Sequence, residues 1–307
     1  MSITSYIQEI GAHDHQLAMR DLRPLSGLGF EQRDAFWQAW EAITPARRDQ
    51  IVHAMVALAE DNVDLDFGAA LFWLLDDADA GVRATALEGL WEDSSARLLR
   101  RLLVMIESDP TPEVRAGAML ALGRFAYLSV IEELSTEDGE EIRTTLIQAM
   151  LDQEQPLDVR RRALEGASYF ADAVEVQREI ELAYAGNEQL LRESALVAMG
   201  RSMLPRWLPT IGAALGSASP ALRYEAARAA GEMAESARAL ALPLASLIDD
   251  SDSEVALAAI WALGQLGGDF ARGALQRVRK GRDETRGQAA EDALEELSLD
   301  ESRFGRT

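Results

Sequence analysis

Residues 111–123 of the chain are TPEVRAGAMLALG, and this stretch decides the fold. Its threonine and proline suit the start of a helix, because a hydroxyl caps free amide groups and proline is tolerated at the first helical position. After Val114, small or apolar residues return at Ala118 and at Leu122, so they lie along one face of that helix. The stretch therefore predicts a short helix whose buried face is lined by small side chains.

The same pattern recurs along the chain. Taking the residue at position 114 as the anchor, the copies are anchored at positions 82, 114, 159, 191, 222, 255 and 285, at intervals of 32, 45, 32, 31, 33 and 30 residues. An apolar helix is expected ahead of each copy, for example at residues 98–106 and 240–248. Each repeat is therefore predicted to be an antiparallel helix pair of about thirty residues, which must stack on its neighbours to bury its apolar face.

This D-x-D-x-x-V-R-x-x-A-x-x-A-L-G style of unit resembles HEAT repeats, in particular the short repeats of the phycobilin (phycobilisome) lyase-like class, over residues 64–297. The resemblance implies an all-α fold, an α-solenoid (α-α superhelix) of helix pairs. It also implies a ladder of Asp and Arg between neighbouring repeats, with Ala256 breaking it in the sixth copy. The ladder arginines would be Arg83, Arg115, Arg160, Arg192, Arg223 and Arg286.

The segments outside the regular repeats complete the predicted organisation. Residues 1–30 are expected to form an N-terminal helical cap, and residues 31–61 a divergent first helix pair of a solenoid spanning 31–297. The long interval places an insertion near 129–141, predicted to be an acidic loop that either decorates a binding face or is simply solvated. Residues 298–307 are expected to be a flexible tail.

The glycines that end several repeats also carry a prediction. Glycine is the usual residue at a helix end in the left-handed conformation, so these positions are interpreted as helix ends. They are Gly123, Gly200, Gly231 and Gly264.

The chain is strongly acidic, with a formal net charge of −22 over 307 residues and no cysteine. Such a charge gives solubility, repels nucleic acid and anionic membranes, and attracts basic partners. The one basic run, residues 277–282, does not offset it. No apolar run reaches the roughly 18 residues of a membrane span, and the N-terminus lacks the pattern of a signal peptide. We therefore expect a cytoplasmic protein that binds neither nucleic acid nor membrane.

Residues suited to catalysis are scarce. The three histidines are His13, His15 and His53, and the first two form a poor metal site beside the chain end. No nucleophile elbow, phosphate-binding loop or dinucleotide fingerprint stands in a strand–turn–helix context. Carboxylate pairs such as Asp249-Asp250 are interpreted as helix caps. We expect no metal, no cofactor and no catalytic residue.

A candidate partner surface follows from the resemblance, which implies that the second helix of each pair lines the concave side. The places two and six residues after the anchor point away from the buried stripe. They carry a predicted aromatic patch of Tyr224, Arg228, Leu257 and Trp261, which Trp91 would extend. Acidic selectivity would come from the neighbouring Glu88, Glu165, Glu193 and Glu225. The alternative left open is that the aromatic residues pack on a neighbouring helix.

The sequence thus favours a non-catalytic scaffold or adaptor that binds a basic or amphipathic protein. Two alternatives remain. A phycobilin lyase-like protein that binds a tetrapyrrole is supported by the repeat type alone, and lyase-like activity is the main catalytic alternative. Self-assembly through open solenoid ends would make the chain a structural protein.

Overall fold

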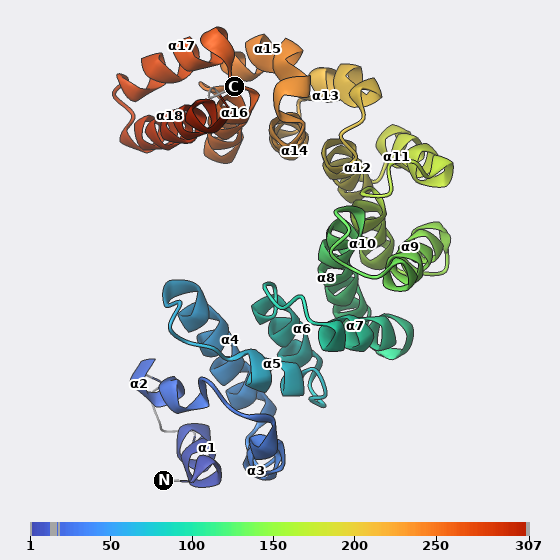
Figure 1. Cartoon of the computed structure of the whole chain (residues 1–307), viewed down its shortest axis with the longest axis vertical. Helices are drawn as coiled ribbons and strands as arrows, with labels where there is room; N and C mark the ends of the chain where they lie inside the picture. Colours follow the sequence, from blue (N-terminus) through green and yellow to red (C-terminus); the bar gives the residue numbers. More distant parts are fainter. Residues whose placement is uncertain (1, 13–16, 18, 305–307) are drawn as a thin grey trace. The chain divides into compact units, whose positions relative to one another are not determined.

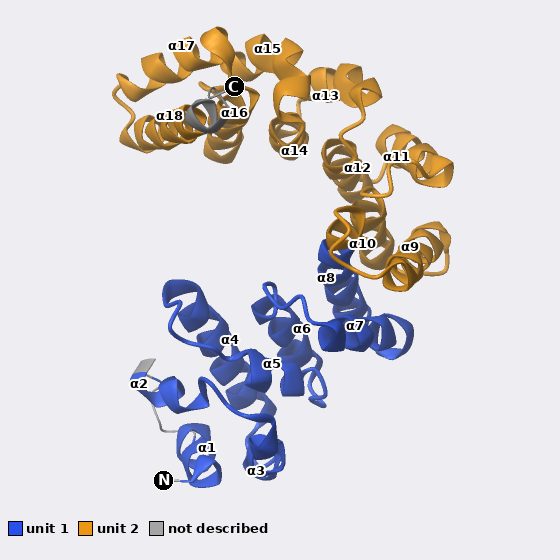
Figure 2. Ribbon diagram, in the orientation of Figure 1, with its two compact units in different colours: residues 1–125 blue, residues 126–307 orange. Residues whose placement is uncertain are grey.

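The computed structural model describes residues 2–12, 17 and 19–304, and every regular element among them is a helix (Figure 1). By its contacts the chain divides into two compact units, Met1–Phe125 and Ala126–Thr307, and the division falls inside helix α8 (Pro112–Val130) (Figure 2). The predicted fold class, an all-α solenoid of stacked helix pairs, is confirmed.

The first unit is built around buried aromatic rings. Its other helices are α1 (Ile3–Gly11), α2 (Met19–Leu22), α3 (Arg33–Trp40), α4 (Pro45–Asp61), α5 (Gly68–Leu74), α6 (Ala80–Gly89) and α7 (Ala96–Ser108), with 3-10 turns at Arg23–Leu25 and Phe30–Gln32. Phe36 on α3 stacks on Trp40 with ring centres 5.2 Å apart, and it meets Trp73 of α5 at 5.3 Å. These rings hold α3, the first helix of the expected divergent pair α3 and α4, to α5 of the following repeat.

The second unit stacks five helix pairs in two layers. The pairs are α9 (Thr136–Leu151) with α10 (Leu157–Ala167), α11 (Val174–Ala185) with α12 (Gln189–Arg201), α13 (Leu208–Ala214) with α14 (Pro220–Glu232), α15 (Ala241–Leu247) with α16 (Ser253–Leu266), and α17 (Gly268–Arg279) with α18 (Glu284–Phe304). The 3-10 turns Pro205–Trp207 and Ala234–Leu240 precede α13 and α15. The second helices α10, α12, α14, α16 and α18 pack side by side (Figure 1). We call them the second-helix layer.

Glycines in this layer allow close helix packing and do not end helices, which corrects the sequence-based interpretation. Gly200, Gly231 and Gly264 lie inside their helices, and the glycines with positive φ are others, such as Gly267 at +63°. A Cβ atom on Gly200 would stand 2.8 Å from the Cα atom of Ala229 in the next repeat. The close approach of neighbouring helices is therefore what requires glycine there.

The insertion and the tail are more helical than expected. Residues 129–141 do not form an acidic loop: α8 continues to Val130, and α9 begins at Thr136. Ser135 caps α9 by accepting a hydrogen bond from the Asp138 amide, and acidic residues in the first turn suit the positive end of the helix dipole. At the C-terminal end, α18 runs through much of the expected tail to Phe304, with Leu297 buried. Residues 305–307 lie outside the described part of the chain.

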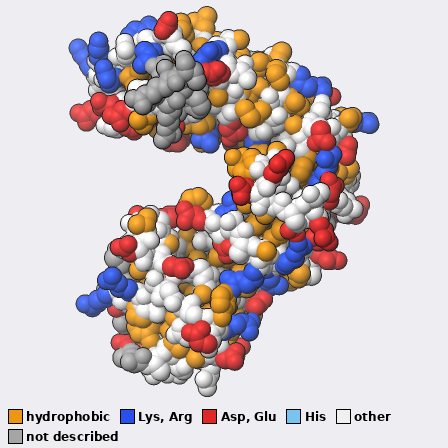
Figure 3. Space-filling view, viewed as in Figure 1, with side chains coloured by type: hydrophobic (Ala, Val, Ile, Leu, Met, Phe, Trp, Pro, Cys, Tyr) orange, Lys and Arg blue, Asp and Glu red, His pale blue; other side chains and the backbone are white. Residues whose placement is uncertain are grey.

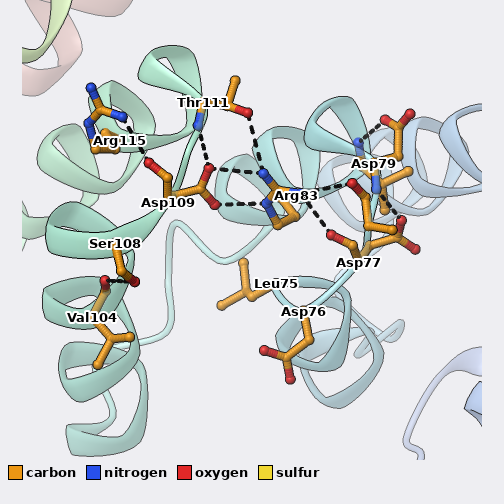
Figure 4. A network of polar contacts seen from close by, with 12 residues as sticks. Leu75, Asp76, Asp77, Asp79, Arg83, Val104, Ser108, Asp109, Thr111 and Arg115 are labelled. Atoms are coloured by element: carbon orange, nitrogen blue, oxygen red, sulfur yellow. Dashed lines mark hydrogen bonds and ion pairs between the residues drawn. The ribbon is translucent and has the colours of Figure 1, made fainter.

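Two of the predicted ladder arginines each bridge to the next repeat through an aspartate. The Nε and Nη2 atoms of Arg83 donate to Asp109 at 2.8 and 2.9 Å, while its Nη1 atom donates to the Asp77 carbonyl (Figure 4). Arg223 repeats this pattern in the second unit, donating to Asp250 at 2.7 and 2.8 Å. Each aspartate also accepts a hydrogen bond from the amide two residues later and so fixes the following helix start.

The other ladder arginines bond differently. Arg115 donates to the Asp109 carbonyl and Arg286 to the Asp250 carbonyl. Arg286 also pairs with the carboxylates of Asp249, at 3.9 Å, and Asp283, at 3.4 Å. Arg160 lies 3.9 Å from Glu179, and the Arg192 guanidinium lies 5.5 Å from the Tyr184 ring. Gly186 and Ser217 occupy the sequence places where aspartates of the complete rungs stand. The ladder is therefore incomplete in the middle of the second unit, since a rung needs both partners.

Candidate functional site

The predicted aromatic patch lies on α14 and α16 of the second-helix layer. Tyr224 and Arg228 are one turn apart on α14, and Leu257 and Trp261 are one turn apart on α16, so each pair shares a helix face. The guanidinium carbon of Arg228 lies 4.4 Å from the centre of the Trp261 ring, within the range of a cation–π contact. The structure thus brings the four residues onto two adjacent helices.

These residues are half-buried rather than fully exposed, because the patch also takes part in helix packing. Trp261 lies against the backbone of α14: a Cβ atom on Gly231 would stand 2.3 Å from its Cζ3 atom. The alternative that the aromatic residues pack on a neighbouring helix therefore holds for one side of Trp261. The Arg228 guanidinium lies over the face of the same ring.

Glu165 does not face a partner, which corrects its assignment as a selectivity residue. Only 3% of it is exposed. Ser194 of α12 donates to its Oε1 atom at 2.5 Å, and Arg162 donates to its Oε2 atom at 2.8 Å. A buried carboxylate with these hydrogen bonds joins α10 to α12 and is structural.

A row of aromatic and charged side chains crosses the ends of these helices, which the sequence analysis did not detect. The rings of Tyr127 and Tyr169 lie 5.6 Å apart, and the Arg201 guanidinium lies 5.6 Å from the Tyr169 ring. Glu232 comes next, 4.0 Å from Arg228. Burial raises the pKa of Glu232, and the nearby Arg201 and Arg228 partly offset that rise. The row connects the tyrosines to Trp261 across five consecutive repeats, from α8 to α16.

Beside Tyr224 lies a pocket of about 510 Å³ formed by the starts of α12, α14 and α16. Pro220, Ala221 and Val255 give it apolar walls, and carboxylates surround it. The acidic residues in its lining are Glu225, Asp252 and Glu254. Glu193 stands one turn after the lining residue Gln189, which donates to it at 2.8 Å. The pocket is therefore apolar inside and negatively charged around its edge.

Glu225 is the most perturbed carboxylate of this site. Its pKa is raised to about 7, chiefly by burial and then by the neighbouring carboxylates of Glu165 and Glu193, while Arg228 lowers it in part. Near neutral pH this side chain is therefore divided between its protonated and ionised forms. A cation placed in the pocket would favour the ionised form and would itself be held there.

The other two predicted partner-binding residues lie in the first unit. Glu88 is exposed near the end of α6, and Trp91 follows that helix with 63% of its surface exposed. These two residues therefore belong to the first unit, whereas the other predicted partner-binding residues lie in the second.

The sequence of the chain matches a known protein family. A family model of HEAT repeats matches residues 68–168 and 208–295, which together are more than half of the chain. The chain belongs to the HEAT-repeat family. The resemblance drawn from the repeat pattern is thereby confirmed, whereas no curated protein is significantly similar in sequence.

Solved structures resemble the chain at low identity. Importin beta is 16% identical with a TM-score of 0.47, covering 96% of this chain and 44% of its own. Human deoxyhypusine hydroxylase is 22% identical with a TM-score of 0.38, covering 86% and 96%. The complex of CpcE and CpcF of phycocyanin lyase from Nostoc sp. is 21% identical with a TM-score of 0.38, covering 55% and 99%. No activity or partner transfers to this chain from likenesses of this degree.

Within the described residues of this HEAT-repeat protein, no group of three or more His, Asp or Glu side chains is arranged to hold a metal ion. His53 is exposed with its Nδ1 atom 3.0 Å from the Asp49 carbonyl, and His13 and His15 lie outside the described residues. None of the described helices has the length and apolar character needed to span a membrane.

Proposed function

We propose that this HEAT-repeat protein is a non-catalytic scaffold or adaptor, which binds a basic or amphipathic segment of another protein on the second-helix layer of its second unit. The observation that carries the proposal is the pocket beside Tyr224, which combines apolar walls with Glu225, Asp252 and Glu254. We place this activity in the cytoplasm.

Charge supports a basic partner. The pocket lining contains three carboxylates and no lysine or arginine, and the whole chain has a net charge of −22. Like-charged partners would be repelled, and a basic segment would be attracted over distances of about a Debye length. A lysine or arginine reaching the pocket would meet Glu225, whose pKa is raised by burial and by the neighbouring carboxylates, and would favour its ionised form.

The aromatic residues would add affinity to this charge. Tyr224 lines the pocket, and Trp261 with Arg228 lies along the same layer. Tyrosine, tryptophan and arginine supply large contact areas and dominate binding energies at protein interfaces. An amphipathic helix or extended segment could then lay apolar side chains on Tyr224 while its basic side chains reach the carboxylates.

The direct test is photo-cross-linking in lysate of the source cell. A benzoylphenylalanine at position 221, in the pocket wall, should cross-link a protein at a segment rich in lysine or arginine. The same group at position 175, exposed on α11 in the other layer, is the control. Cross-links at a basic segment from position 221 alone support the proposal. The same product from both positions, or an acidic segment, contradicts it.

A further inference from the structure

The first unit contains a second cleft, of about 600 Å³, which we call the Trp91 cleft. It lies where the loop after α4, the turn after α6 and the start of α7 meet. Its floor is made of buried apolar residues, among them Leu65, Phe67 and Leu71. Its outer lining exposes large apolar side chains: Phe30 is 59% exposed, Trp91 63% and Val63 97%.

Exposed apolar side chains occur elsewhere on the chain as well (Figure 3), but three of the five most exposed large ones among the described residues, Phe30, Val63 and Trp91, gather around this cleft. Scattered exposed residues need no explanation, but a contiguous apolar lining is typical of an interaction site. The walls are also anchored: the Asp66 carbonyl accepts a hydrogen bond from the Gly27 amide at 2.7 Å, and the Asp93 carbonyl accepts one from Arg124. The cleft is therefore a formed feature of the unit.

An aromatic ring of this cleft already binds a cation of the chain itself. The guanidinium carbon of Arg97 lies 4.2 Å from the centre of the Phe30 ring and 3.8 Å from that of Phe72, so the cation lies against two aromatic faces. Tryptophan holds a cation more strongly than phenylalanine does, and arginine stacks on aromatic rings more readily than lysine. The exposed ring of Trp91 in the same cleft offers such a face.

Charge in the cleft points the same way. Its lining contains the four carboxylates of Glu60, Asp66, Glu92 and Asp93, against Arg97 as its one basic residue. Arg124, which is not part of the lining, lies near Glu92 and Asp93, so the four carboxylates outnumber the two arginines around an apolar floor. Asp66 and Asp93 already accept hydrogen bonds from the Gly68 and Ser95 amides, so Glu60 and Glu92 are the carboxylates that would face a basic occupant. An acidic occupant would be repelled.

We propose that the Trp91 cleft binds an arginine-bearing segment of another protein, with a guanidinium on the Trp91 ring beside Glu92 and an apolar neighbour on the floor. This site uses other residues and another unit than the pocket beside Tyr224, so it does not depend on the function proposed above. Its occupant is defined by alternating arginine and apolar side chains.

The test is ¹⁹F NMR of the full chain labelled with 5-fluorotryptophan. The six tryptophans give six signals, and Trp91→Phe identifies the one from Trp91. The probe is the peptide acetyl-Leu-Arg-Leu-Arg-amide, and its matched control replaces arginine by citrulline, which keeps the shape but has no charge. We expect a saturable shift of the Trp91 signal with the arginine peptide and binding at least threefold weaker with citrulline.

A variant pair locates the charge effect. Glu92→Gln should weaken binding of the arginine peptide about twofold to fivefold, as the loss of one exposed ion pair does. Glu107→Gln, which removes an exposed carboxylate of α7 outside the cleft, should leave it unchanged. An unmoved Trp91 signal, or equal binding of the arginine and citrulline peptides, overturns the proposal. A shift of the Trp261 signal alone would do so too, and would leave the site beside Tyr224 standing.

Discussion

Completing the ladder in the second unit should stabilise it. Asp250 accepts two hydrogen bonds from Arg223 of the preceding repeat and one from the Asp252 amide at 2.9 Å. One repeat earlier, Ser217 stands in the same place: its hydroxyl accepts a hydrogen bond from the Ser219 amide at 3.2 Å. The arginine that would face it is Arg192, whose Nε atom is buried without a hydrogen-bond partner. We expect Ser217→Asp to supply that partner.

The size of the effect follows from the rung that exists. Arg223 and Asp250 make a two-point contact with 14% and 7% of their side chains exposed. A hydrogen bond to a charged group contributes about 1.5–3 kcal/mol, and the cost of burying the new carboxylate offsets part of it. We therefore expect a net gain of about 1–2 kcal/mol. For a folding unit of this size that corresponds to a rise in Tm of about 2–8 °C.

Thermal and urea unfolding followed by circular dichroism measure this gain. Ser217→Asn is the control, because it keeps the hydrogen bond to the helix start and adds no charge. Arg192→Met supplies the background in which the gain should vanish. The reasoning is refuted if Ser217→Asn stabilises as much as Ser217→Asp, or if the gain persists without Arg192.

Three further predictions concern other contacts. Glu225 has a pKa near 7, above that of the unfolded chain, so its contribution to stability is present at acidic pH and is lost as pH rises through about 4.5 to 7. Glu225→Gln should therefore raise the Tm at pH 8 and flatten its dependence on pH, and a Tm unchanged at pH 8 would contradict this. Gly200→Ala should cost about 1–3 kcal/mol in chemical denaturation because the added methyl meets the backbone of α14. Gly273→Ala on α17, where the methyl meets nothing within 4 Å, should instead gain about 0.5–1 kcal/mol, and equal effects would exclude the packing argument. Asp109→Ala should destabilise the first unit by about 3–5 kcal/mol, because it leaves Arg83 buried without its carboxylate, and a loss below 1 kcal/mol would show the rung to be unimportant.

The repeat could be predicted from the sequence because its helix starts and small residues recur at a nearly constant interval. The roles of single residues depended on neighbours that the repeat does not show. Gly231 suits a helix end as well as a close approach, and the Trp261 ring beside it decides between the two. The fourth copy has its ladder arginine, Arg192, but the next repeat has Ser217 where a complete rung has an aspartate. Only a comparison of the two repeats reveals this.

The partner surface was predicted in part for the same reason. The positions two and six residues after the anchors include Tyr224, Arg228 and Trp261, which do lie on one layer. They also include Glu165, which is buried and accepts a hydrogen bond from Ser194 of the next helix. Glu225 was expected only as an acidic neighbour of Tyr224, and the pocket beside it was missed, because the packing of α12, α14 and α16 creates that pocket. The row of Tyr127, Tyr169 and Arg201 was missed as well. Tyr169 and Arg201 lie ten residues after their anchors and Tyr127 lies thirteen after its own, so all three stand near the ends of the helices.

The most direct test of the proposed function is the affinity of the second unit's pocket for a basic segment. Fluorescence anisotropy of a labelled acetyl-Arg-Leu-Arg-Leu-Arg-Leu-amide peptide would be measured for the Trp91→Phe chain, with and without the further change Tyr224→Ala/Glu254→Gln, at low and high salt. We predict binding that weakens at least fivefold with the added change and that falls with salt, while Glu175→Gln on α11 leaves it unaltered. Binding that is indifferent to the pocket residues would contradict the account.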